Sequence, residues 1–391
     1  SRFGYTNWNN TYKSFTPLAF YGPLNVENTM NADGSTVTGR HNSVYESKRT
    51  DNTYTFETFG TYNFALPNEH HFETVAGISL AKVSGDETNG SRQDVPFNSW
   101  EFADITAATG VNTADNVNAI SMGNSQYFRK NLSYFGRVNY DWKDKYLVSF
   151  SARRDGSYAF GVDNKFANFY AGSLGWVVSS EDFFNVDFIN YLKIRGSYGT
   201  IGNENVSPQY VGIISGGPSY AGDANSNGYT FGNTFVSGST VGSYANTTLR
   251  WEKQIQSNVG FDARFGKYWS LSADYFDKSV DGLLFTPSVS LYLGTAAPPT
   301  ANIGSTKSNG IDLNLGFTYP ISKQGQFSTN ITFTTAKNLV TATNSDGTAI
   351  IPGGYYFNGQ SQNVTRFQQG YAPGYFYGYK TAGLFQNATQ I

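Results

Sequence analysis

The stretch IDLNLGFTY, residues 311–319, alternates apolar and polar residues along its whole length. Ile, Leu, Leu, Phe and Tyr occupy one phase, and Asp, Asn, Gly and Thr occupy the other. Because successive side chains of a β-strand point to opposite faces, this pattern predicts a strand with one apolar face and one polar face. Residues 327–335 repeat the pattern, and residues 251–265 extend it over a longer run.

The same alternation recurs through most of the chain, in runs of about ten residues, the length of a tilted strand that crosses a membrane. The further runs are 56–66, 74–83, 132–142, 146–154, 170–178, 192–200 and 269–276. The sequence therefore predicts an all-β protein with about ten long strands.

The connections between these runs alternate between short and long. Short turns follow every second run, at 66–72, 143–145, 266–267 and 320–325, with a somewhat longer one at 179–191. The other connections are rich in Gly, Asn, Ser and Thr and lie at 84–131, 201–250 and 281–309, with 155–165 as a shorter exception. Long loops at one end and tight turns at the other are typical of outer-membrane barrels. We therefore expect an antiparallel transmembrane β-barrel with long extracellular loops and short periplasmic turns.

The polar phase of the runs carries most of their charge. Its charged members are Arg137, Asp141, Arg153, Lys193, Arg195, Glu252, Asp262, Arg264 and Asp274. On a lipid face a mid-membrane Arg or Lys would cost about 2–4 kcal/mol, so this phase is expected to line the lumen. Aromatic residues gather at the strand ends, as rings do at a membrane–water interface. Examples are Tyr140, Trp142 and Tyr146 around one turn and Phe265, Tyr268 and Trp269 around another.

Composition excludes several classes of protein. The 391 residues carry 27 Lys and Arg against 29 Asp and Glu, which argues against nucleic acid as a partner. Cysteine is absent, so the chain has no disulfide and no thiolate metal site. No run approaches the roughly 18 apolar residues of a membrane-spanning helix. A soluble β-sandwich stays open as the alternative, although its strands are shorter and its loop lengths need not alternate.

The two ends of the chain differ from its middle. Residues 1–52 are expected to form loop and irregular strand, and the final LFQNATQI shows no amphipathic strand. About ten strands cannot enclose a wide pore, and the first and last segments show no sign of pairing with each other. We therefore expect the chain to be a portion of a larger barrel.

Several ordered segments carry a family resemblance. The strongest is NLSYFGRVNYDWKDKYLVSFSARRDGSYAFG at 131–161. It is followed by SLGWVVSSEDFF (173–184), LKIRGSYGTIGN (192–203), LRWEKQIQSNVGFDARF (249–265), DYFDKSVDGLL (274–284), NIGSTKSNGIDLNL (302–315) and GYAPGYFYGYKTAGLFQN (370–387). Together these segments resemble the SusC/RagA-type TonB-dependent outer-membrane transporters of Bacteroidota, in the order expected of that family.

The resemblance implies a 22-stranded barrel in the outer membrane with an internal plug. It also implies a SusD-like surface lipoprotein over the extracellular mouth, a glycan or peptide substrate, and energy coupling through TonB. Residues 1–391 would be a portion of the barrel domain, without the plug, the N-terminal region that TonB contacts, or the closing strands.

Catalytic and metal sites are not evident in the sequence. The loop DANSNG, 223–228, begins like an EF-hand, but Thr234 stands where calcium needs a bidentate carboxylate, so an Asn/Gly turn is the preferred interpretation. His70 and His71 are expected in a solvated turn beside Glu69, and His41 has no evident partner. No histidine lies near a nucleophile elbow. We expect no enzyme activity, no cofactor and no bound metal.

Aromatic residues in the long loops are the candidate ligand-binding residues, because their faces can stack on sugar rings or peptide side chains. They are Trp100, Tyr220, Tyr229, Tyr355, Tyr356 and Phe357. Packing between loops, or contact with a lipoprotein, is the alternative role of each one. The Arg153-Arg154-Asp155 segment is interpreted as a salt-bridged transition from strand to loop.

Three hypotheses for function follow. The first is import of oligosaccharides or peptides by the barrel of a SusCD-type complex. The second is a SusC-like barrel that serves as a structural subunit of an outer-membrane assembly or secretion complex. The third is a soluble all-β adhesin or glycan-binding domain, which the apolar phase of the strands disfavours.

Overall fold

The structure is a computed structural model that describes residues 1–18, 41–112, 119–208, 210, 212–216, 228–231, 234–237, 239–286, 298–343, 350–357, 360–381 and 383. The chain divides into two compact units. Unit 1 consists of Ser1–Thr58 and Ser79–Asn131, and unit 2 of Phe59–Ile78 and Leu132–Ile391. None of the helices in these residues is long and apolar enough to cross a membrane.

Long strands dominate the described residues, which confirms the predicted all-β class. Eleven of them follow one another in the hydrogen-bonded order β1-β2-β3-β4-β5-β6-β7-β12-β13-β16-β17. Their bounds are β1 (Arg2–Thr16), β2 (Ser43–Leu66), β3 (His70–Gln93), β4 (Ile120–Trp142), β5 (Tyr146–Ser157), β6 (Phe166–Val177), β7 (Ile189–Asn203), β12 (Glu252–Phe265), β13 (Trp269–Asp281), β16 (Ser305–Pro320) and β17 (Gln326–Ala342).

Shorter elements lie in the connections. Two are single-turn 3₁₀ helices, η1 (Trp100–Phe102) and η2 (Val178–Ser180). The short strands are β8 (Ile213–Gly216), β9 (Gly228–Phe231), β10 (Thr234–Ser237), β11 (Ser239–Ser243), β14 (Leu284–Phe285), β15 (Ala301–Asn302), β18 (Ile351–Phe357), β19 (Gln360–Phe367) and β20 (Tyr375–Phe376). They pair into small sheets of two or three strands.

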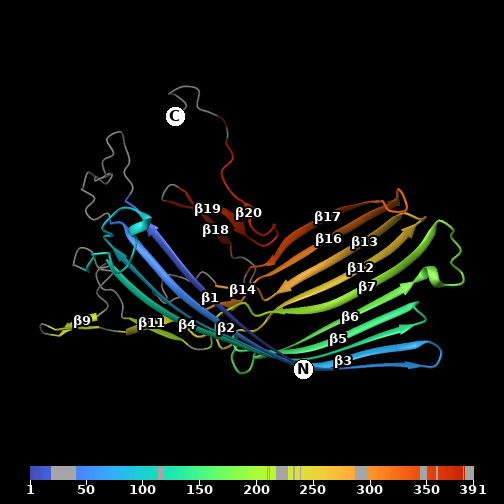
Figure 1. The fold of residues 1–391 in the computed structure, drawn as a ribbon, viewed down its shortest axis with the longest axis horizontal. Coiled ribbons are helices and arrows are strands. Elements are labelled where there is room, and N and C mark those ends of the chain that lie inside the picture. The colour runs from blue at the N-terminus through green and yellow to red at the C-terminus, as the bar shows by residue number, and fades with distance from the viewer. Residues whose placement is uncertain are drawn as a thin grey trace. The chain divides into compact units, whose positions relative to one another are not determined.

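The register of unit 2 confirms the predicted separation of apolar and polar side chains. The strands from β5 to β17 run antiparallel and side by side (Figure 1). One cross-strand row is Trp176, Ile194, Phe261, Ala273, Leu313 and Phe333. The adjacent cross-strand row, one residue along each strand and therefore on the other face, contains Arg195, Gly260, Asp274, Asp312 and Thr334. The sheet therefore has one apolar face and one polar face.

The apolar face is uncovered over much of its area. Val259 is 63% exposed, Ile331 60% and Phe333 57%, although all three are large hydrophobic residues. In water such a continuous apolar surface would promote association, whereas hydrocarbon accommodates it without cost. The exposed face therefore has the composition of a lipid-facing surface.

Tight turns join the strands at one end of unit 2, near the predicted positions. Asn68 and Glu69 take left-handed backbone conformations in the β2–β3 turn, as Lys143 and Asp144 do in the β4–β5 turn. Consecutive left-handed residues match the twist of the flanking strands in a hairpin. The β12–β13 turn uses Gly266, with a φ of 54°.

Unit 1 corrects two predictions. The sequence predicts loop and irregular strand for residues 1–52, yet β1 is a regular strand that pairs along its whole length with residues 43–57 of β2. The predicted loop 84–131 is also shorter, because β3 continues to Gln93 and β4 begins at Ile120. In this ladder Asn7 opposes Asn52 and Trp8 opposes Asp51, so neither face is consistently apolar. Alternation did not reveal this ladder, because neither of its phases is consistently apolar.

Small cores anchor the connections in each unit. In unit 1, Val44, Val95, Ala103 and Ala108 form a buried cluster under the β3–β4 connection. In unit 2, Ala159, Phe160 and Leu249 form another, which joins the β5–β6 connection to the segment before β12. The ends of these connections are therefore packed against one another inside their own unit.

Candidate functional site

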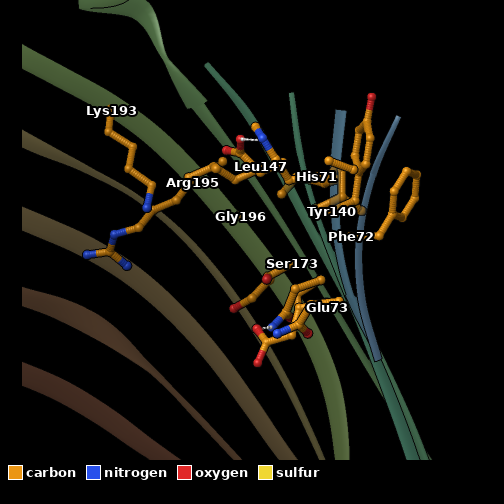
Figure 2. A pocket seen from close by; sticks show the side chains of 18 of the residues that line it. His71, Phe72, Glu73, Tyr140, Leu147, Ser173, Lys193, Arg195 and Gly196 are labelled. Atoms are coloured by element: carbon orange, nitrogen blue, oxygen red, sulfur yellow. Dashed lines mark hydrogen bonds and ion pairs between the residues drawn. The ribbon is translucent and has the colours of Figure 1, made fainter. Parts of the chain in front are cut away.

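A hollow of about 850 Å³ lies against the polar face of unit 2 (Figure 2). It extends from β2 and β3 across β4, β5 and β6 to β7, and reaches one residue of β12. Most of its lining belongs to the polar phase: Asn63, His71, Glu73, Asn139, Asp141, Ser149, Ser173, Lys193, Arg195, Ser197 and Asn258. Phe64, Phe72, Tyr140, Leu147, Val148 and Leu174 also line it, so polar and charged side chains stand beside apolar ones in a hollow that is large enough for a solute or a polypeptide segment.

Arg195 is the centre of the charge network on this face. Its Nε donates to Asp262 Oδ2 at 3.0 Å, and its Nη2 donates to Asp274 Oδ2 at 2.6 Å. Asp274 lies two strands away, and the intervening position on β12 is Gly260. Ser272 Oγ completes the network by donating to Asp262 Oδ1 at 2.7 Å. Because Gly260 has no side chain, the guanidinium can reach across β12.

Lys193 lies next to Arg195 on the same face of β7, as Figure 2 shows. It opposes Asp262 in the strand register, but none of the ion pairs within 4.0 Å in the described part of the chain includes it. Its side chain passes over Gly175, where an added Cβ would lie 3.0 Å from Lys193 Cε. Lys193 therefore presents a positive charge to the hollow.

Hydrogen bonds also order the β3–β5 side of the hollow. Asn139 Nδ2 donates to Glu73 Oε2 at 3.0 Å, and Ser149 Oγ donates to Asn139 Oδ1 at 2.7 Å. His71 Nδ1 lies 3.5 Å from Asp141 Oδ1. These groups bind one another across three strands and leave further donor and acceptor capacity toward the hollow. The arrangement suits binding of polar groups, and the described residues hold no cluster of three or more His, Cys, Asp or Glu that could bind a metal.

The histidine pair corrects a prediction. His70 and His71 begin β3 instead of lying in the turn, because the left-handed Asn68 and Glu69 close the turn first. His70 stacks on Trp142 with ring centroids 5.5 Å apart, and its Nδ1 lies 2.8 Å from Tyr140 Oη. The two neighbouring histidines therefore point to opposite faces of the sheet, as alternation requires.

Aromatic rings concentrate at the turn end of the strands. From β4 to β6 they include Trp142 and Tyr146, which stack at 5.4 Å, and Trp176, which lies 6.2 Å from Phe183. Farther along, Phe317 lies 4.5 Å from Trp269. These contacts confirm the predicted clusters of aromatic side chains near the turns.

Glu181 ties the β6–β7 turn to this aromatic cluster. Its carboxylate accepts hydrogen bonds from Tyr146 Oη at 2.6 Å, Trp176 Nε1 at 2.9 Å and Lys145 Nζ at 3.1 Å. These three donors, with Tyr146 contributing most, lower the pKa of Glu181 from 4.5 to about 2. The carboxylate is therefore charged throughout the physiological range.

The predicted ligand-binding aromatics that the structure describes lie on three different elements. Trp100 lies in η1 of unit 1, is 56% exposed, and has Lys13 Nζ 5.8 Å from its ring centroid. Tyr229 is in β9, while Tyr355, Tyr356 and Phe357 are in β18. Tyr220 and the DANSNG positions 223–227 lie outside the described residues, as does the LFQNATQI segment.

The Arg153-Arg154-Asp155 segment has the local contacts expected of a strand-to-loop transition. Arg153 Nε donates to Asp155 Oδ1 at 2.6 Å, and its Nη2 donates to Ser133 Oγ at 2.9 Å. Arg154 lies over the ring of Phe166 at 5.1 Å. The charged groups of Arg153, Arg154 and Asp155 therefore contact other residues of this chain.

Sequence reasoning assigned Arg195, Asp262 and Asp274 to the polar face but did not identify them as one network. It also missed Glu73 and Asn139 as a pair. The sequence feature that could have indicated these contacts is that all five residues occupy the polar phase a few residues from a short turn. That placement puts them on the same face, near one end of their strands.

Comparisons with known proteins agree with this architecture. A family model described as "TonB dependent receptor-like, beta-barrel" matches residues 1–389. TonB-dependent receptor P3 from Formosa agariphila is 29% identical over 350 residues, which cover 88% of this chain and 32% of that protein. TonB-dependent receptor SusC from Bacteroides thetaiotaomicron is 30% identical over 255 residues, 64% of this chain and 25% of SusC.

A structural relative supports the same fold. The RagAB peptide transporter superimposes with a TM-score of 0.71 at 21% sequence identity, over 96% of this chain and 37% of that chain. The present chain thus spans about a third of the length of the first curated relatives that it matches.

Proposed function

This chain belongs to the TonB-dependent receptor-like β-barrel family of outer-membrane proteins, and on that premise we propose that its protein imports oligosaccharides or peptides across the outer membrane. In this proposal residues 1–391 are a portion of the barrel wall of a SusC-like transporter. The remaining wall, a plug and the TonB-contacting region belong to other parts of the polypeptide.

The observation that carries the proposal is the division of unit 2 into two chemically distinct faces. Ile194, Phe261 and Leu313 share an apolar row, whereas Arg195, Asp274 and Asp312 share the adjacent row on the opposite face. An apolar exterior is stable in hydrocarbon, and a charged interior can contact water, solutes and polypeptide. A transport barrel needs both surfaces.

The proposed partners follow from the family. A SusD-like surface lipoprotein would cap the extracellular end, and TonB would supply energy from the periplasmic side. The name of the RagAB peptide transporter supports a peptide substrate, and similarity to SusC supports a barrel of the same type. The proposed substrate is an oligosaccharide or a peptide.

Loop aromatics are the proposed contacts to substrate. Trp100 is the best-supported member, because its ring is more than half exposed, lies on a short helix and has Lys13 Nζ 5.8 Å from its centroid. An exposed aromatic ring, with only two rotatable side-chain bonds, can stack on a sugar or a peptide side chain at low conformational-entropy cost. The other proposed contacts are Tyr220, Tyr229, Tyr355, Tyr356 and Phe357.

Purification of the full-length protein from native outer membranes in mild detergent tests the proposal. Mass spectrometry of the purified complex would identify co-purifying proteins and small molecules. A SusD-like lipoprotein together with an oligosaccharide or a peptide is the expected result. Many subunits of an assembly or secretion complex, without such a ligand, would instead identify a structural barrel.

A further inference from the structure

A second concavity, of about 570 Å³, lies on unit 2 over β2, β3, β4 and β5. Its walls include Tyr62, Val138 and Phe150, which are 68%, 40% and 52% exposed. All three belong to the apolar phase: Val138 shares the phase of Tyr140 on β4, Phe150 that of Val148 on β5, and Tyr62 that of Phe64 on β2. This groove is therefore on the lipid-facing side of the sheet, separate from the polar hollow.

The floor of the groove is made by small residues in one cross-strand row. The turn at 67–69 places Gly60 opposite Ala76, and Phe64 stacks on Phe72 at 4.7 Å in the same register. The turn at 143–145 places Gly136 opposite Ala152, with the Asn139–Ser149 hydrogen bond in the same register. Four strands in succession thus lack a large side chain at this level, while Tyr62 and Phe150 project beside it.

The groove has the chemistry of a hydrocarbon site. Arg137 is the only charged residue that lines it, and strand alternation directs that side chain to the polar face. Three inter-strand spacings give the floor a length of about 14 Å. Its volume falls in the range of about 300–1,000 Å³ that is typical of small-molecule sites.

Packing explains why one molecule would occupy the groove in an ordered way. Lipid tails are as apolar as the groove, so burial from water supplies no driving force inside a membrane. A gap beside the floor, however, would forfeit the dispersion contacts of every atom that lines it. A flexible hydrocarbon chain can follow the groove and restore those contacts.

We propose that this groove binds one acyl chain of a membrane lipid. The occupant is a lipid chain, because lipid is the medium that bathes this face and the lining projects few polar groups into the groove. These are the phenol hydroxyl at the tip of Tyr62 and the hydroxyl of Thr74, which already donates to the carbonyl of Tyr62 at 2.8 Å. The proposal depends on the chain spanning the membrane and does not depend on transport.

The site can be filled without distorting the sheet. A Cβ at Gly60 would meet no atom within 4 Å, and one at Gly136 would lie 3.7 Å from the carbonyl oxygen of Val75. A double variant, Gly60→Leu with Gly136→Leu, would therefore occupy the groove with side chains. Gly172→Leu is a matched control, since its Cβ would lie 3.7 Å from Ser149 O and Gly172 does not line the groove.

The experiment is electron paramagnetic resonance of the full-length protein in phosphatidylcholine vesicles that contain phosphatidylcholine spin-labelled near the end of one acyl chain. The number of motionally restricted lipids per protein is measured for the wild type and both variants. The expected result is one restricted chain fewer in the double variant and no change in Gly172→Leu. Equal numbers in all three proteins, or an equal loss in the control, would overturn the proposal.

Ala76→Leu provides a second route if the double variant fails to fold. This single change fills the middle of the floor and leaves both glycines in place. It is expected to remove the same restricted chain, and retention of the wild-type number in a folded Ala76→Leu protein would contradict the proposal.

Discussion

The guanidinium of Arg195 on β7 reaches across Gly260 of β12 to the carboxylate of Asp274 on β13, with contacts of 2.5 Å and 2.6 Å. The same side chain binds Asp262, so one cation links three strands of the polar face. This link needs the Arg–Gly–Asp row that the register creates, and it therefore connects sheet geometry directly to the charge of the interior surface.

Gly260→Ala is expected to destabilise the barrel. The new Cβ would lie 2.5 Å from the carbonyl oxygen of Ala273 and would also collide with the Asp274 carboxylate. Overpacking of this kind costs about 1–3 kcal/mol. The temperature at which the folded barrel changes its electrophoretic mobility would measure the loss. Gly172→Ala, whose Cβ has ordinary contacts, should melt like the wild type, and an equal loss in that control would contradict the steric explanation.

Arg195→Met is expected to leave two carboxylates without their shared partner. The Arg195 side chain is 31% exposed, so solvent screening reduces the penalty to about 1–2 kcal/mol. Arg195→Lys should restore part of the loss, because lysine keeps the charge but cannot form the same forked contacts. Thermal unfolding of both variants, beside Lys193→Met, tests this order. A larger drop in melting temperature for Lys193→Met than for Arg195→Met would contradict a stabilising role of the Arg195 network.

The stability that Glu181 contributes to the β6–β7 turn is expected to fall in acid. Because its folded pKa is lowered from 4.5 to about 2, ionised Glu181 contributes stability that is fully present above pH 4.5. That contribution is lost as the pH falls through 4.5 toward 2. Glu181→Gln should therefore melt below the wild type at pH 6, and the two melting temperatures should converge toward pH 2. A gap that stays constant over this range would show that Glu181 does not act through its charge.

Trp100→Ala is expected to weaken retention of substrate or lipoprotein without lowering stability. The ring is largely exposed, so its loss leaves no buried cavity. Removal of an aromatic binding contact typically weakens affinity by about tenfold, or ~1.4 kcal/mol. Binding to the purified full-length protein should be compared with Tyr244→Ala, another exposed loop aromatic. Unchanged affinity in Trp100→Ala would remove this residue from the proposed site.

The sequence predicts which face of the sheet each side chain occupies, but not which side chains contact one another across the strands. Alternation assigned Ile311, Leu313 and Asp312 to their faces, because a strand in lipid must keep charge off its exterior. It could not pair Arg195 with Asp274, since that contact depends on the register of β7, β12 and β13. Register is a tertiary property that the period-two pattern leaves open.

The extent of the strands was underestimated for a related physical reason. β1 carries polar residues on both faces, as the Asn7–Asn52 pair illustrates, and so do residues 84–93 of β3 and 120–131 of β4. Backbone pairing extends the β1–β2 ladder, and polar contacts such as Asn7–Asn52 and Lys13–Glu46 join its side chains, so no apolar phase marks it in the sequence. The apolar groove was missed as well, because Gly and Ala in a strand carry little hydrophobic signal until neighbouring strands align them.

The assignment of one face to lipid and the other to the interior is tested most directly on β16. The chain contains no cysteine, so single cysteines can be placed at each position of 311–319 in a cysteine-free background of the full-length protein. Labelling in native membranes with a water-soluble thiol reagent should alternate, with reaction at 312, 314 and 316 and protection at 311, 313 and 315. Protection at the odd positions should disappear on denaturation. Uniform labelling, or labelling of the odd positions in intact membranes, would contradict a membrane-spanning wall with a polar interior.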